Sequence, residues 1–213
     1  MSRAVVRGAP PALYGFYCWL VRRAWRIMGG RLQATGLEHV PASGPCLIIA
    51  NHQSYLDPLF LHAVAPRVLH AMAKSTQFAS PIMARILAHI YVFPVRRYQI
   101  DAQAVRTVLR RLAAGQAVMI YVEGERSWDG RLQPARRGVL KLLLKAGVPV
   151  IPCRIDGSYN VMPRWDRKIR PGTVRISFAP PLELPKVDDR ASRNRLLTAT
   201  ETTVRQALGG PMD

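Results

Sequence analysis

Apolar runs of strand length alternate with helical patterns along most of the chain. Six runs, bounded by glycine, proline or polar residues, predict strands. They lie at residues 46–50, 67–73, 91–95, 117–122, 148–155 and 173–178. The third run contains Pro94, which has no amide proton to donate to a neighbour, so we expect this segment at an edge of the sheet or at a strand end.

Helical patterns fill the stretches between these runs. We expect helices at residues 58–65, 81–89, 101–114, 137–146 and 192–208. Pro81 suits the first turn of the second helix, and Asp101 can cap the third. Gly115 and Gly147 follow two of the helix ends, as C-terminal glycines do. This alternation predicts an α/β sandwich, a single domain with a largely parallel or mixed central sheet flanked by helices.

Residues 12–28 form a separate amphipathic pattern at the N-terminus. Arg22, Arg23 and Arg26 fall on one side of a helix, and aromatic and aliphatic side chains occupy the rest. The stretch is too short and too charged to span a bilayer, which needs about 20 mostly apolar residues. Its tryptophans, tyrosines and arginines are typical of helices that lie in the membrane interface. We therefore expect residues 1–30 to form a membrane-interface helix and residues 31–213 the main domain. The alternative is an amphipathic helix packed on the core.

Composition narrows the class of partner. The chain has 31 basic and 13 acidic residues among 213, a net charge of +18, which favours an anionic partner such as nucleic acid, an acidic membrane or a phosphorylated substrate. The basic residues are spread along the chain and no nucleic-acid motif is present, so we expect no nucleic-acid partner. A non-enzymatic basic protein remains the alternative of a different class.

The cysteines and histidines give no sign of a metal site or a disulfide framework. Cys18, Cys46 and Cys153 include no C-x-x-C pair, and two of them lie in apolar runs. We read them as buried, reduced thiols. No two histidines or cysteines have the spacing of metal ligands, so we expect no metal.

A histidine and an aspartate five positions apart follow the first apolar run. His52 can act as a general base near neutral pH, and Asp57 can fix its tautomer and stabilise the imidazolium. The alternative is a histidine at a helix start and a carboxylate in its first turn. Ser54 lies close by, but it lacks the strained G-x-S-x-G turn of a hydrolase nucleophile. The histidine would therefore activate a hydroxyl supplied by a substrate.

Two further blocks carry arginines near strand ends. Arg96 and Arg97 follow the run at 91–95 and can hold a phosphate through the fork of the guanidinium; the alternative is a solvated basic turn. Residues 121–127 read Tyr-Val-Glu-Gly-Glu-Arg-Ser, in which Arg126 can also bind a phosphate. The alternative for this third block is a polar turn.

A fourth block, residues 148–153, reads Val-Pro-Val-Ile-Pro-Cys and offers an apolar wall for an acyl chain, or simply a core strand with a kink. In this order the four blocks resemble the glycerolipid acyltransferases related to 1-acylglycerol-3-phosphate acyltransferase. That family carries an N-H-x-x-x-x-D block, an arginine block, an F-P-E-G-T-R-S block and a V-P-V/I-P-type block. The resemblance covers about residues 46–155.

The resemblance assigns roles to individual residues. It makes His52 the general base and Asp57 its orienting partner, and it matches Arg97, with Arg96 as the fallback, to the arginine of the second block. The acceptor-binding block is matched by Glu123, Gly124, Arg126 and Ser127. Tyr121-Val122 replaces Phe-Pro, and Glu125 replaces threonine. A carboxylate beside a phosphate site would repel an anionic headgroup unless it points away, so the acceptor stays open.

The resemblance also implies an activity. It predicts an O-acyltransferase, peripheral or monotopic on the cytoplasmic face of the cell membrane. The donor would be acyl-CoA or acyl-carrier protein, with no further cofactor. The acceptor would be the hydroxyl of 1-acylglycerol-3-phosphate or a related lysophospholipid, with an ornithine-type lipid as the alternative.

Overall fold

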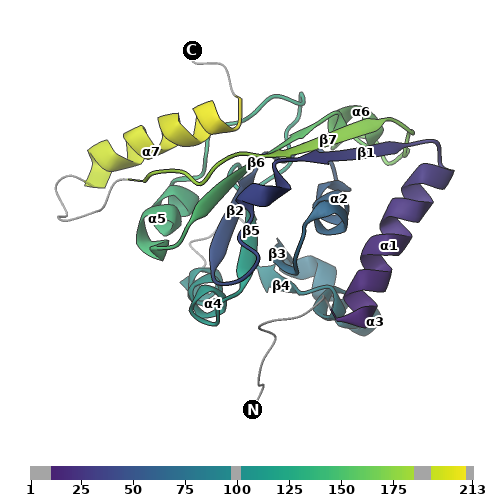
Figure 1. Cartoon of the computed structure of the whole chain (residues 1–213), viewed down its shortest axis with the longest axis horizontal. Helices are drawn as coiled ribbons and strands as arrows, with labels where there is room; N and C mark the ends of the chain where they lie inside the picture. The colour runs from purple at the N-terminus through teal and green to yellow at the C-terminus, as the bar shows by residue number, and fades with distance from the viewer. Residues whose placement is uncertain (1–10, 97–101, 185–192, 210–213) are drawn as a thin grey trace.

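A seven-stranded mixed sheet forms the centre of the protein (Figure 1). The computed structural model describes residues 11–96, 102–184 and 193–209. The strand order is β1-β7-β6-β2-β5-β3-β4. The strands are β1 (Arg31–Thr35), β2 (Cys46–Ala50), β3 (Leu69–Lys74), β4 (Val92–Val95), β5 (Ala117–Tyr121), β6 (Val150–Asp156) and β7 (Thr173–Phe178).

Helices cover both faces of this sheet. They are α1 (Ala12–Ile27), α2 (Asp57–Val64), α3 (Pro81–His89), α4 (Ala102–Ala113), α5 (Arg137–Ala146), the short α6 (Ser158–Val161) and α7 (Arg193–Ala207), with 3-10 turns η1 (Leu37–His39) and η2 (Ser75–Phe78). Figure 1 shows α4, α5 and α7 on one side of the sheet and α1, α2 and α3 on the other.

Strand directions confirm the predicted fold class. β2 runs parallel to both β5 and β6, and β3 runs parallel to β5 and β4. β7 is antiparallel to β6 and pairs in parallel with β1, so these two strands run against the other five. β4 lies at the end of the strand order, which confirms the edge position expected from Pro94.

The alternation of side chains in β2 divides the core into two layers. Leu47 and Ile49 pack with residues of α4, α5 and α7, such as Val108. Cys46, Ile48 and Ala50 face the other way and pack with residues of α1 and α2. Successive residues of a strand point to opposite faces, so a strand covered on both faces is apolar throughout. All five residues of β2 are buried.

Several sequence predictions need correction. β1 was not expected, because Arg-Leu-Gln-Ala-Thr is half polar and forms an edge strand with exposed positions at every second residue. The expected strand at 67–73 begins at Leu69, where pairing with β5 starts. Arg67 lies in the preceding bend, and its side chain donates to the carbonyls of Pro41, Gly44 and Gly115. Other bounds shift by one or two residues. The cap expected at Asp101 lies outside the described residues.

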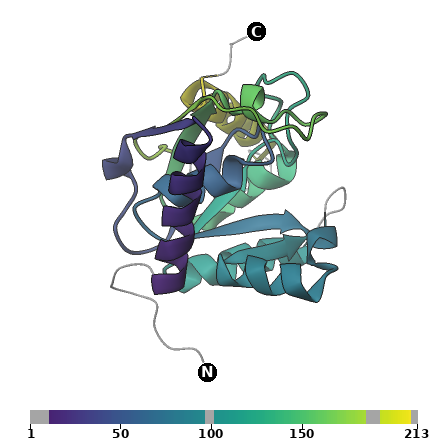
Figure 2. The same cartoon turned by 90° about the vertical axis from the view of Figure 1, so that its right-hand side faces the viewer.

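α1 packs on the rest of the fold through one side. Tyr14, Cys18 and Trp25 are buried, and the Leu69 amide donates to the Tyr14 hydroxyl over 3.3 Å. Figure 2 shows α1 at the front, outside the sheet. The alternative, an amphipathic helix packed on the core, therefore holds for this side of α1. Among the described residues, no helix is long and apolar enough to cross a membrane.

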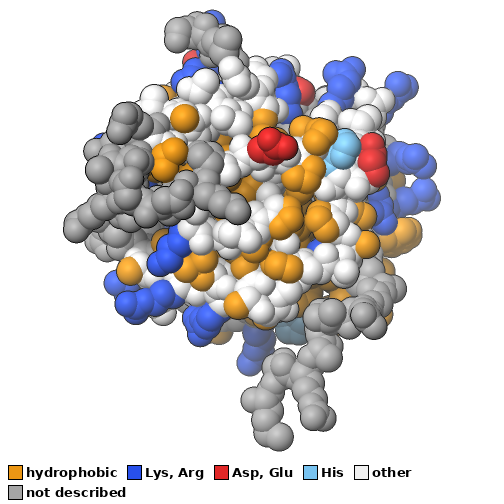
Figure 3. Space-filling view, turned by 60° about the vertical axis from the view of Figure 1, so that its left-hand side comes forward, with side chains coloured by type: hydrophobic (Ala, Val, Ile, Leu, Met, Phe, Trp, Pro, Cys, Tyr) orange, Lys and Arg blue, Asp and Glu red, His pale blue; other side chains and the backbone are white. Residues whose placement is uncertain are grey.

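The opposite side of α1 exposes large apolar side chains. Leu13, Phe16, Leu20 and Ile27 are 48–74% exposed. At helical spacing these four residues form one stripe, which we call the α1 ridge. Elsewhere the surface is widely basic, and Figure 3 shows lysine and arginine side chains scattered around the periphery of another face rather than gathered in one patch.

The segment between β1 and β2 contains two glycines with left-handed backbone, Gly36 and Gly44. They form a matched pair of sites for testing how tightly this segment packs. Gly36 has φ +70°, and a Cβ there would lie 1.9 Å from the Phe178 carbonyl oxygen. Gly44 has φ +79°, and nothing lies within 4 Å of its Cβ position. Both alanine variants carry a backbone penalty of about 1–2 kcal/mol. We expect Gly36→Ala to lower the free energy of unfolding by at least roughly 2 kcal/mol more than Gly44→Ala in urea denaturation. Equal losses would contradict this packing.

Candidate active site

The carboxyl ends of the parallel strands bring the sequence blocks to one edge of the sheet. His52 lies two residues beyond β2, and Glu123 lies two residues beyond β5, the neighbour of β2. Arg96 directly follows β4 at the same edge. Three blocks separated in the sequence therefore follow strands at the edge where α/β sheets form their sites, with those of His52 and Glu123 on neighbouring strands.

His52 and Asp57 form a buried pair. His52 Nδ1 lies 2.9 Å from Asp57 Oδ2, and the two side chains are 7% and 0% exposed. The same oxygen accepts hydrogen bonds of 2.7 Å from the backbone amides of Gln53 and Ser54. An oxygen that accepts from two amides acts as an acceptor here, so the proton of the third contact belongs to Nδ1. This tautomer makes Nε2 the basic nitrogen of the ring.

Contacts from β5, from the loop after it and from β6 hold the turn that carries His52. The Asn51 side chain accepts from the Ile155 amide over 2.7 Å and donates to the Ile155 carbonyl over 2.8 Å. The Ser127 amide donates to the His52 carbonyl over 2.7 Å. The Tyr121 ring stacks on the His52 ring, with centroids 3.9 Å apart and planes 13° apart. Sequence reasoning missed the roles of Asn51 and Tyr121, although both belong to blocks that it singled out.

Glu123 connects two strand ends rather than facing the pocket. It is 2% exposed, and its oxygens accept from the His52 amide over 2.7 Å and from the Gln133 amide over 3.2 Å. Burial raises the pKa of this carboxyl from 4.5 to about 7, against the lowering effect of both backbone hydrogen bonds. Both oxygens are used within the protein, which favours a positioning role over the acceptor contact that the family resemblance implies.

Gly124 and Ser127 shape the turn between them. Gly124 has φ +72°, and a Cβ there would lie 2.9 Å from Arg136 Cγ, so only glycine fits without a shift. Ser127 is fully buried, and its hydroxyl donates to the Arg131 carbonyl over 2.8 Å. These two residues set the path of the turn around Arg126.

Glu125 is paired with arginines. Its two oxygens accept from Arg136 Nη2 over 2.7 Å and from Arg164 Nη1 over 2.8 Å. Arg164 also donates to the Arg126 carbonyl over 2.9 Å. Glu125 does not line the pocket beside His52. The carboxylate is thus largely neutralised, which removes the objection to an anionic acceptor.

A pocket of about 130 Å³ opens beside His52. Arg126 lines it, with the guanidinium carbon 5.5 Å from the centre of the Tyr55 ring. The rest of the lining is mainly apolar and includes Pro58, Leu59, Ala71, Ala73, Leu87, Ile90 and Val92. A base, a cation and an apolar wall therefore share one cavity.

Among the described residues, the second and fourth blocks do not line the pocket beside His52. Arg97 lies outside the described residues. Arg96 lines a separate cavity of about 400 Å³ with residues of β4 and α4. The fourth block forms β6, an internal strand whose Pro152 pairs with Ile49 of β2. The apolar wall expected from this block is wrong for the pocket beside His52, whose apolar residues come from α2, β3 and the α3–β4 segment.

Two further histidines and the three cysteines are buried. Burial lowers the pKa of His62 to about 4, and burial together with Arg111 lowers that of His70 to about 3. All three cysteines are buried and unpaired. In the described ranges, no three histidine, cysteine or acidic side chains gather as metal ligands would.

Comparisons with known proteins agree with this architecture. The family model described as "Acyltransferase" matches residues 31–156. A chloroplastic 1-acyl-sn-glycerol-3-phosphate acyltransferase of Brassica napus is 31% identical over 157 residues, which cover 72% of this chain and 45% of that protein. The human 1-acyl-sn-glycerol-3-phosphate acyltransferase alpha is 28% identical over 196 residues, covering 86% of this chain and 69% of the human protein.

The comparison of structures extends over nearly the whole chain. The 1-acyl-sn-glycerophosphate (LPA) acyltransferase PlsC of Thermotoga maritima superimposes with a TM-score of 0.74 at 21% identity, covering 94% of this chain and 81% of that one. This likeness shows the shared fold. The chain spans about half the length of the plant relatives, 45% in both.

The raised pKa of Glu123 predicts a pH dependence of stability. Between about pH 4.5 and about pH 7 the folded protein keeps a proton that the unfolded chain has released. The contribution of this group to stability therefore falls as the pH rises through that window. In denaturant unfolding, the stability of Glu123→Gln relative to the wild type should rise by up to roughly 3 kcal/mol from pH 4.5 to pH 8. A difference that stays constant with pH would contradict the buried, partly protonated state.

Proposed function

The chain belongs to the acyltransferase family, and from this premise we propose that it transfers a fatty acyl group from a thioester to the hydroxyl of 1-acylglycerol-3-phosphate or a related lysophospholipid. The observation that carries the proposal is the buried His52–Asp57 pair, which shares a cavity edge with Arg126 and an apolar wall. Base, phosphate ligand and acyl site are the three parts that such a transfer needs.

His52 acts as the general base in the proposed mechanism. Nε2 takes the proton from the acceptor hydroxyl as its oxygen attacks the thioester carbonyl carbon. The tetrahedral intermediate collapses, the C–S bond breaks, and the leaving thiolate receives the proton from the imidazolium. Asp57 stabilises the positive ring through Nδ1. Because both substrates are held together, no covalent acyl-enzyme is needed.

The pocket divides the substrates by chemistry. The aliphatic lining beside His52 suits an acyl chain, and Arg126 suits the phosphate of the acceptor. The pairing of Glu125 with Arg136 and Arg164 supports an anionic acceptor, since the carboxylate is compensated. The donor is acyl-CoA or acyl-carrier protein, which release the same kind of thiol, and the chemistry requires no further cofactor.

The protein works at a membrane surface in this proposal. The acceptor is a lipid, and the α1 ridge offers an exposed apolar stripe beside arginines, a composition typical of helices that lie in the interface. We place the protein as a peripheral or monotopic enzyme on the cytoplasmic face of the cell membrane.

Substitutions in the pair test the base directly. His52→Gln and Asp57→Asn should each lower kcat by about 10²–10⁴-fold, measured as thiol release from acyl-CoA with 1-acylglycerol-3-phosphate. Ser54→Ala is the control, because its hydroxyl donates to the Met162 carbonyl and takes no part in transfer; it should stay within about tenfold of the wild type. Equal turnover by His52→Gln and the wild type would refute the base assignment. A larger loss in Ser54→Ala would indicate a nucleophile instead.

Arg126 separates the candidate acceptors. Arg126→Gln should raise KM for 1-acylglycerol-3-phosphate by about 10–100-fold, since a charged hydrogen bond is worth roughly 1.5–3 kcal/mol. Arg131→Gln, an exposed arginine of the same loop, is the matched control and should change KM little. With an ornithine-type acceptor, which has no phosphate, Arg126→Gln should have little effect. If turnover is high with that acceptor and absent with the phosphorylated one, the phosphate assignment fails.

A further inference from the structure

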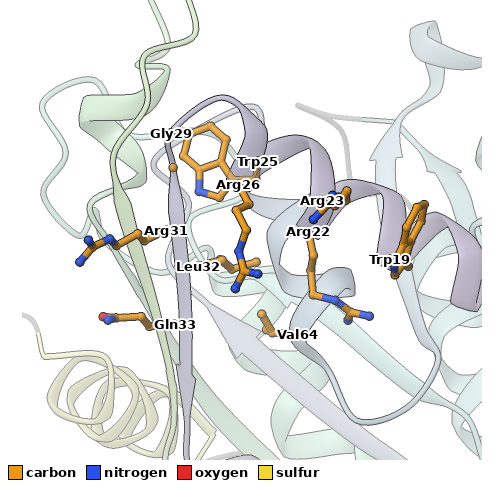
Figure 4. Close-up of a pocket in the computed structure, with 11 residues that line it drawn as sticks. Trp19, Arg22, Arg23, Trp25, Arg26, Gly29, Arg31, Leu32, Gln33 and Val64 are labelled. Atoms are coloured by element: carbon orange, nitrogen blue, oxygen red, sulfur yellow. The ribbon is translucent and has the colours of Figure 1, made fainter.

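A second cavity lies between the C-terminal half of α1 and β1, away from His52 (Figure 4). It measures about 700 Å³ and shares no lining residue with the pocket beside His52. Its lining includes Arg22, Arg23, Trp25, Arg26 and Arg31. We call this cavity the α1–β1 groove. The proposed acyl transfer makes no use of it.

The charge of the groove is one-sided. Its described lining holds four arginines and no acidic residue. Arg22 donates to the Ala63 carbonyl. Within the described part of the chain, the side chains of Arg23, Arg26 and Arg31 have no hydrogen-bond or ion-pair partner. Figure 4 shows Arg26 reaching from α1 toward the space beside β1, with Arg22 one turn away. Neighbouring cations repel one another, and a bound anion would relieve that repulsion.

A buried tryptophan adds an independent sign of a ligand. Trp25 is 4% exposed and lines the groove, and its indole nitrogen has no hydrogen-bond partner. The indole N–H can only donate, and a buried donor without an acceptor is costly. Gly30 lets this ring sit close to the backbone, because a Cβ there would lie 2.1 Å from the ring. The groove therefore offers donors of two kinds and requires an acceptor.

The donor set selects a phosphate. Guanidinium groups bind phosphate oxygens in paired hydrogen bonds, and an indole N–H can donate to a further oxygen. The helix dipole also favours arginines near the C-terminal end of α1, but this effect requires neither a cavity nor a buried indole. A volume of about 700 Å³ exceeds what a single ion needs and suits a phosphate that carries an organic group.

The α1 ridge indicates where this phosphate comes from. Arg23 lies three residues after Leu20 and four before Ile27, so it borders the ridge on the helix surface. Arg26 and Arg22 follow on the next strip of the same helix, toward the groove. A ridge inserted among acyl chains places the neighbouring guanidiniums at the depth of lipid headgroups. The source is therefore a membrane lipid rather than free phosphate.

We propose that the α1–β1 groove binds the phosphate headgroup of an anionic membrane phospholipid, as a site separate from the acceptor site beside His52. This inference rests on the membrane association proposed above. The groove converts that association from a general attraction into binding of a discrete headgroup, and it fixes the rotation of α1 on the surface.

Vesicle binding tests the groove against overall charge. The variant Arg23→Gln/Arg26→Gln is compared with Arg106→Gln/Arg110→Gln, which removes the same charge from the exposed side of α4, at the opposite side of the molecule in Figure 1. The vesicles are phosphatidylcholine with roughly 30 mol% phosphatidylglycerol, which gives an anionic surface. On these vesicles the groove variant should bind about 25-fold more weakly than the wild type, about fivefold per arginine. The α4 variant should lose less than about threefold. Equal losses by the two variants would overturn the proposal.

Neutral vesicles separate this proposal from membrane association itself. On phosphatidylcholine alone, the groove variant should bind like the wild type, whereas Leu20→Glu/Ile27→Glu should lose binding to both kinds of vesicle. If the wild type binds neither kind, the proposed membrane association fails. All variants should keep the wild-type circular dichroism spectrum.

A soluble probe tests the groove without any membrane. Dihexanoylphosphatidylglycerol, kept below its micelle concentration, should shift the indole N–H resonance of Trp25 in a ¹⁵N–¹H spectrum, with the peak assigned by its loss in Trp25→Phe. The Arg23→Gln/Arg26→Gln variant should require about tenfold or more of the probe for the same shift. Inorganic phosphate that shifts the peak at equal or lower concentration would point to free phosphate and contradict the headgroup. No shift with either probe would overturn the site.

Discussion

One carboxylate oxygen organises the candidate active site. Asp57 Oδ2 accepts from the amides of Gln53 and Ser54 and from Nδ1 of His52, all within 2.9 Å. Three donors on one buried oxygen fix the turn between β2 and α2 and the plane of the imidazole at the same time. They also determine the tautomer, because the oxygen has no proton to give in these contacts. The basic nitrogen of His52 follows from this arrangement.

The sheet supplies what the local turn cannot. Parallel pairing of β2 with β5 and β6 places Glu123 and Ile155 at the same edge as His52. Glu123 binds the His52 amide, and Ile155 pairs with the side chain of Asn51 through two hydrogen bonds. The strand ends are thus tied to one another by polar contacts that burial strengthens. The cost of burying Glu123 is visible in its raised pKa, as expected where a site is held in a fixed geometry.

The sequence predicts the fold class and the His52–Asp57 pair well, because both depend on local signals. The pair spans five residues, and apolar strands of the interior are hard to mistake. Glu125 shows where such reasoning ends. Its neutralisation depends on Arg164, 39 residues away, and no local pattern announces that contact. Glu123 is similar, since a motif gives the residue type but not the direction of its side chain. The sequence does not predict β1, because an edge strand with exposed alternate positions has few apolar residues.

The proposed transfer and the proposed headgroup site occupy separate cavities, one beside His52 and one between α1 and β1. The transfer depends most directly on which ring nitrogen of His52 carries the proton. A long-range ¹⁵N–¹H correlation spectrum of the protein with labelled histidine, near neutral pH and assigned by His52→Gln, reads this directly. The contacts of Asp57 Oδ2 predict that the neutral ring carries its proton on Nδ1 and leaves Nε2 unprotonated. A ring that carries its proton on Nε2 instead could not accept one from the acceptor hydroxyl there, and would contradict the account.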